Sequence, residues 1–160
     1  MHRLGAAGAV ILILLAGCGE PTIDVDLPQR AGTERVADLA GILNADALEA
    51  RLEQAAQEGT DIVVLTYESE QAGCGEAYRA AQEFVMKWAA NVALVAVAEP
   101  GDFKAEAEPR ERCFGLQPSA STEVSGGLRE RIAEELVPPK TADNDWDGAF
   151  AVAVDALMEQ

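Results

Sequence analysis

Three acidic side chains are placed where they could bind a divalent cation. Asp38 precedes the first expected helix, Glu68 follows the first buried strand, and Asp102 lies in the turn after the second. All three are expected at the carboxyl edge of the sheet, where open α/β sheets bind ligands. Carboxylate oxygens suit Ca²⁺ or Mg²⁺ better than zinc. The alternative interpretation is that they are turn and cap residues, since the chain has 28 Asp and Glu residues.

A second acidic cluster lies near the C-terminus. It consists of Asp143, Asn144, Asp145 and Asp147, just before a helical pattern. Acidic side chains near a helix N-terminus are favoured by the helix dipole, so capping is the preferred interpretation of this cluster.

The composition excludes several kinds of chemistry. The only histidine is His2, in a segment expected to be removed, so a Ser-His-Asp triad, a Cys-His dyad and a His-ligated zinc are excluded for the mature chain. Neither a Gly-rich phosphate loop nor a Cys-x-x-Cys pair is present. The net charge is -16, from 12 basic and 28 acidic residues, which argues against a nucleic-acid partner. Acid–base chemistry would therefore depend on carboxylates.

Apolar periodicity predicts one domain in which helices and strands alternate. Asn44 is suited to cap the first helix and Gly59 to end it. Two runs that are apolar at every position predict neighbouring parallel strands buried on both faces. The pattern indicates an α/β fold, a three-layer α/β/α sandwich with a small mixed sheet. The expected elements are helix 44–59, strand 62–65, helix 77–88, strand 92–98, strand 103–107, helix 124–136 ended by Pro138-Pro139, and helix 146–157.

The N-terminus has the pattern of an exported lipoprotein. Arg3 precedes an apolar stretch, residues 4–17, that is too short to span a bilayer comfortably. Residues 15–18, Leu-Ala-Gly-Cys, resemble the bacterial lipobox, whose cysteine is acylated. We therefore expect a signal peptide at 1–17, lipidation at Cys18, a flexible tether at 18–35 and a location on the extracytoplasmic face of the cell membrane. An uncleaved anchor or a buried cysteine is the alternative.

The two other cysteines are expected to pair. Export places the domain in an oxidising compartment, and lipidation of Cys18 leaves only Cys74 and Cys113. Both lie in predicted loops near the sheet, so a disulfide between them is expected. Two unrelated buried thiols are the alternative.

A resemblance to a known family lies in residues 36–43, Val-Ala-Asp-Leu-Ala-Gly-Ile-Leu. The run is similar to the Val-x-Asp-x-Ala-Gly-x-Leu opening of the TPM domain family, also called TPM phosphatase, and the following elements keep the family's order to residue 157. Asp38 matches the family's opening aspartate, Trp88 the tryptophan that closes the second helix, and Asp102 an acidic turn. The resemblance implies an α/β/α sandwich over 36–160, tethered outside the membrane.

Some residues depart from the family's pattern. Residues 114–117, Phe-Gly-Leu-Gln, resemble its Gly-Tyr-Gly-Leu-Glu, but Cys113 replaces the first glycine and Gln117 the glutamate. Asn91-Val92 stands where the family has Asn-Gly. Some members are described as cation-binding acid phosphatases and others as assembly or repair factors. We therefore expect a membrane-anchored extracytoplasmic binding or assembly module that is not catalytic, with a membrane protein complex as partner. The alternative is a divalent-cation-dependent acid phosphatase.

Overall fold

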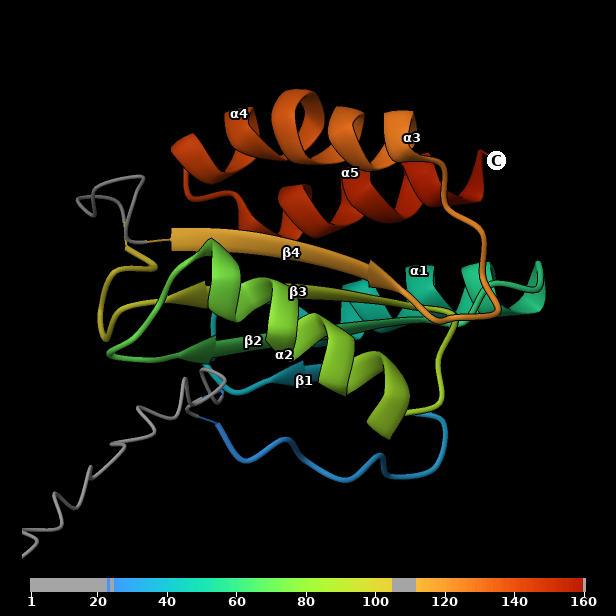
Figure 1. Ribbon diagram of the computed structural model, residues 1–160, viewed down its shortest axis with the longest axis horizontal. Coiled ribbons are helices and arrows are strands. Elements are labelled where there is room, and N and C mark those ends of the chain that lie inside the picture. Colours follow the sequence, from blue (N-terminus) through green and yellow to red (C-terminus); the bar gives the residue numbers. More distant parts are fainter. Residues whose placement is uncertain (1–22, 24, 105–111, 160) are drawn as a thin grey trace, which may run out of the picture.

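The computed structural model describes residues 23, 25–104 and 112–159 (Figure 1). A four-stranded sheet lies between helices on both faces, which confirms the predicted α/β/α sandwich. The strands are β1 (Val36–Asp38), β2 (Ile62–Glu68), β3 (Val92–Ala98) and β4 (Arg112–Pro118). The helices are α1 (Ala45–Gln57), α2 (Cys74–Lys87), α3 (Gly126–Glu130), the π-helical segment η2 (Arg131–Leu136), α4 (Val137–Ala142) and α5 (Trp146–Met158).

The sheet is mixed, as expected. Its strand order is β1-β2-β3-β4, with β1, β2 and β3 parallel and β4 antiparallel to β3. The register pairs Leu65 with Val95 and Val95 with Gly115. The start of β4 therefore lies beside the carboxyl ends of the other strands, at left in Figure 1.

Alternating side chains of the central strands form two separate cores. Val63 and Leu65 pack with α2, which covers the near face in Figure 1. Ile62 and Val64 pack with α1 and α5 on the other face. Because both faces are covered, every position of β3 is buried, which explains its uninterrupted apolar sequence.

Helix α1 begins and ends as the sequence predicts. The Asn44 side chain accepts a hydrogen bond from the Ala47 amide, and so caps the first turn. Gly59 follows the helix with φ of 103°, a conformation that glycine adopts without steric cost.

Residues 25–35, here called the N-terminal strap, are bound to the domain. The Arg30 guanidinium bonds both carboxylate oxygens of Asp61, at 2.7 and 3.0 Å, and lies 5.7 Å from the ring centroid of Trp88. The Trp88 indole N–H donates to the Pro28 carbonyl at 2.9 Å. The described part of the expected tether is thus packed on the domain. Cys18 and the expected signal peptide lie outside the described residues, among which no helix is long and apolar enough to cross a membrane.

The prediction of a strand at 103–107 is wrong for the two residues of it that the structure describes. Phe103 and Lys104 lie in a turn, and residues 105–111 are outside the described ranges. The Phe103 ring instead packs edge-on against Trp146, at 5.0 Å between centroids. The antiparallel partner of β3 is β4.

The prediction that Pro138-Pro139 ends the third helix is also wrong, because a continuous helical run extends from Gly126 to Ala142. Consecutive prolines lack N–H groups and cannot bond the carbonyls four residues back. The preceding turn is a wider π-helical turn, in which the Val137 amide donates to the carbonyl of Ile132, five residues earlier. The prolines then occupy the first turn of α4, directly after this widened turn.

Candidate functional site

The carboxyl edge of the sheet gathers the residues that the sequence singles out. Asp38 is the last residue of β1, Glu68 is the last of β2, and Asp102 lies in the turn after β3. Arg112, the first residue of β4, pairs with Ala98 at the same edge. The three acidic residues therefore lie at the edge that the sequence predicts, and Arg112 lies at the same edge.

Asp38 organises the loop between β1 and α1. Its two carboxylate oxygens accept the amides of Ile42, at 3.1 Å, and Leu43, at 2.9 Å. The Thr66 hydroxyl also donates to this carboxylate. Gly41, with φ of 66°, supplies the left-handed residue that turns the loop back toward Asp38. Asp38 therefore holds its loop together through two hydrogen bonds and ties it to β2 through a third.

Glu68 and Asp102 belong to a second set of turn contacts. Glu68 accepts the Gly101 amide at 2.8 Å and so ties the end of β2 to the turn after β3. The Asp102 amide donates to the Glu99 carbonyl at 2.9 Å, which closes that turn. Within residues 23, 25–104 and 112–159, no three His, Cys, Asp or Glu side chains are grouped so that they could hold a metal ion. The cation site at Asp38, Glu68 and Asp102 therefore stays a prediction.

The second acidic cluster does cap a helix. The Asp145 side chain accepts the Gly148 amide at 2.8 Å at the start of α5 and pairs with Lys140 at 3.0 Å. The pKa of Asp145 is lowered. The main cause is the hydrogen bond from Lys140, and the second is the bond from the Gly148 amide. Asp147 accepts the Asn44 amide at 2.8 Å and thereby joins the starts of α5 and α1.

A buried polar network beneath α2 was not anticipated from the sequence. Glu76 is 3% exposed, and it accepts hydrogen bonds from the hydroxyls of Tyr67 and Ser69, each at 3.1 Å. Burial, together with the nearby Glu76 charge, raises the pKa of Tyr67. Glu76 falls on the apolar face of α2, and that position was the only sign of its burial.

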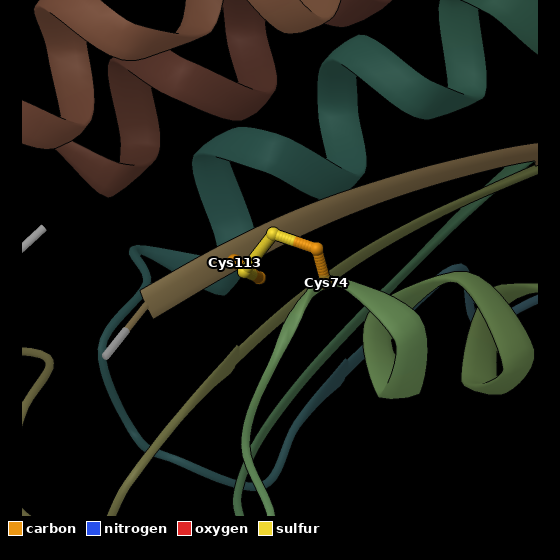
Figure 2. Close-up of a disulfide and its surroundings, with 2 residues drawn as sticks. All are labelled: Cys74 and Cys113. Atoms are coloured by element: carbon orange, nitrogen blue, oxygen red, sulfur yellow. A yellow bond between two sulfur atoms is a disulfide. The ribbon is translucent and has the colours of Figure 1, made fainter. Parts of the chain in front are cut away.

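The disulfide forms as predicted. Cys74 and Cys113 are bonded, with Cα atoms 5.0 Å apart (Figure 2). Neither cysteine lies in a loop as expected, because Cys74 begins α2 and Cys113 is the second residue of β4. The bond therefore ties one helical layer directly to the edge strand of the sheet.

A sequence profile and a solved structure are similar to this chain. The profile of the TPM domain matches residues 36–160. The solution NMR structure of the N-terminal domain of the cg2496 protein from Corynebacterium glutamicum superposes with a TM-score of 0.53. It is 12% identical, and the match covers 87% of this chain and 86% of that one, so the likeness shows the fold alone. No curated protein matches.

Proposed function

Since this chain belongs to the TPM domain family, we propose that it is an extracytoplasmic binding or assembly module that is held at the cell membrane by a lipid on Cys18. Residues 15–18, Leu-Ala-Gly-Cys, support the anchor because small residues before the cysteine suit a lipoprotein signal peptidase. Several acyl chains on one cysteine would hold the module stably, at about 0.8 kcal/mol for each buried methylene. A membrane protein complex is the proposed partner.

The use of Asp38 is the observation that favours binding over catalysis. This residue matches the family's opening aspartate, and its carboxylate accepts three hydrogen bonds from its own loop and from Thr66. The Asp38 carboxylate thus has a structural role in its own loop, which supports the binding proposal. In addition, Gln117 stands where the family has a glutamate, so one of the family's carboxylates is replaced by an amide.

Expression of the full chain and of Cys18→Ser tests the anchor. The wild-type protein should appear in the membrane fraction, with a mass that fits cleavage before residue 18 and acylation. Cys18→Ser should stay uncleaved and unacylated. Unchanged processing of the variant would refute the lipid anchor.

A phosphatase assay tests the absence of catalysis. Detergent-extracted full-length protein would be incubated with a generic phosphomonoester and Mg²⁺ or Ca²⁺, alongside Asp38→Asn. Asp46→Asn is the matched control, because it removes one exposed charge from the first turn of α1. No turnover above background is expected from any of the three proteins. Turnover that Asp38→Asn abolishes and Asp46→Asn retains would replace the binding proposal with the phosphatase.

A further inference from the structure

A cavity of about 580 Å³ opens at the carboxyl edge, between the start of β4, the helical run through η2 and α4, and the start of α5. This volume lies within the range of ordinary small-molecule sites. The walls are mainly apolar and are formed by the Cys74–Cys113 disulfide, Phe114, Val137, Pro138 and Trp146. We call this cavity the Arg112 pocket, because Arg112 is the one charged residue among the described residues that line it.

One edge of the Arg112 guanidinium has no hydrogen-bond partner among the described residues. Nη1 donates to the side-chain oxygen of Asn144. Nε is buried and has no hydrogen-bond partner in the part of the chain that the structure describes. A buried donor without a partner costs free energy, and a ligand that accepts from it would recover part of that cost. The edge formed by Nε and Nη2 is one of the two edges through which arginine binds a carboxylate with paired hydrogen bonds.

Asn144 holds the arginine in position. Its backbone is left-handed, with φ of 56°, a region that asparagine tolerates better than most residues. The Asn144 amide donates to the Thr141 carbonyl at 3.1 Å, which fixes this turn at the end of α4. The guanidinium is thus oriented before any ligand arrives, which reduces the entropic cost of binding.

Two acidic residues near the start of α5, Asp145 and Asp147, have other partners. Asp145 bonds Lys140 and the Gly148 amide, and Asp147 accepts the Asn44 amide. No carboxylate is among the described residues that line the pocket. In a chain of net charge -16, this cavity therefore pairs a positive charge with apolar walls.

We propose that the Arg112 pocket binds a carboxylic acid with an apolar or aromatic body. The carboxylate pairs with the guanidinium of Arg112, whose Nε–Nη2 edge has no other partner among the described residues. The body packs against the disulfide, Phe114 and the ring of Trp146. A single guanidinium matches the single charge of a carboxylate, whereas a phosphate dianion needs more donors than the described lining supplies. This ligand class goes beyond the proposed module and does not depend on Cys18.

Titration of the full-length protein with 3-phenylpropionate tests the proposal, with 3-phenylpropionamide and inorganic phosphate as competing probes. Calorimetry should show saturable binding of the acid, with the amide and phosphate at least tenfold weaker. The indole N–H resonance of Trp146 should shift with the acid. Absence of acid binding, or equal binding of the amide or of phosphate, would overturn the proposal.

Two variants locate the binding. Arg112→Gln should weaken acid binding at least tenfold, whereas Arg129→Gln, which removes an exposed cation from α3, should leave it unchanged. Ala133→Trp should also abolish binding, because residue 133 is an exposed part of the pocket wall and an indole there fills the cavity without replacing Arg112. Thermal melts establish which variants are folded. Undiminished binding to either folded pocket variant refutes the site, and if one variant does not fold, the other decides.

Discussion

Gly115 of β4 lies directly against the backbone of Ala77 in α2. A Cβ atom built on Gly115 would stand 2.6 Å from the Ala77 carbonyl oxygen, closer than real contacts allow. The obstacle is helix backbone, so relief requires α2 to move away from the sheet. This close approach also brings the start of α2 to β4, where Cys74 and Cys113 bond.

Gly115→Ala should therefore destabilise the domain. Overpacking of this kind lowers the free energy of unfolding by about 1–3 kcal/mol. Gly127→Ala is the matched control, because a Cβ at that helical position meets nothing within 4 Å. The control should be neutral or stabilising, by up to about 1 kcal/mol, since alanine favours a helix over glycine. Urea denaturation of both variants measures the difference, and equal effects would contradict the proposed contact.

The disulfide should contribute a large share of the stability. Its cysteines are 39 residues apart, and the chain-entropy treatment gives about 4 kcal/mol for a loop of this length. In a Cys18→Ser background, the denatured and unreduced protein should show no free thiol. Reductant should lower the urea midpoint of that protein but not of a variant that also carries Cys74→Ser and Cys113→Ala. Two free thiols before reduction would exclude the bond.

Arg30 should hold the N-terminal strap. Arg30→Gln removes the paired bonds to Asp61 and the contact with Trp88, so stability should fall by about 1–3 kcal/mol. Amide exchange across residues 25–35 should become faster. Arg51→Gln breaks the exposed ion pair with Asp155 and should change stability by less than about 0.5 kcal/mol. A strap that exchanges no faster in Arg30→Gln would show that this residue does not hold it.

The pKa of Asp145 gives a pH dependence with a defined sign. Because its pKa is lowered in the folded state, the carboxylate adds stability above the unfolded value of 3.8, and this contribution is lost as pH falls through the folded pKa. Asp145→Asn keeps a capping oxygen but removes the charge. The wild type should be more stable than Asp145→Asn at pH 7, and the difference should shrink toward pH 2. In an NMR titration, Lys140→Gln should raise the pKa of Asp145, and an unchanged value would contradict the assigned cause.

Hydrophobic patterning alone is sufficient for α1, β2 and β3. Their apolar periods are complete within each segment, and Asn44 and Gly59 mark the helix ends locally. Strand β4 is different, because Gly115 and Pro118 weaken its strand pattern while the alternation at 103–107 imitates one. What makes 112–118 a strand is tertiary: pairing with β3, the close approach of α2 and the disulfide.

The candidate site also combines features that the local sequence predicts with features that arise only from tertiary contacts. The topology rule correctly places Asp38 and Glu68 at one edge, because it depends only on alternating strands and helices. It cannot show that Asp38 is occupied by its own loop. Arg112 carries no local signal, since its importance comes from Asn144, which is distant in sequence and adjacent in space. Arg30 is a similar case, because its segment has the Pro and Gly content of a linker.

If Cys18 carries the proposed lipid, the N-terminal strap sets how far the domain can lie from the membrane. With lipid on Cys18, only the chain between residues 18 and 23 would separate the membrane from Ile23, which packs on the domain, and it would span at most about 18 Å. A free chain from 18 to 35 would span up to about 60 Å. This shorter connection would confine the domain to a thin layer above the headgroups. Its encounters with the proposed membrane partner would then be a search in two dimensions at high effective concentration, whereas partners that protrude far beyond this layer would stay out of reach.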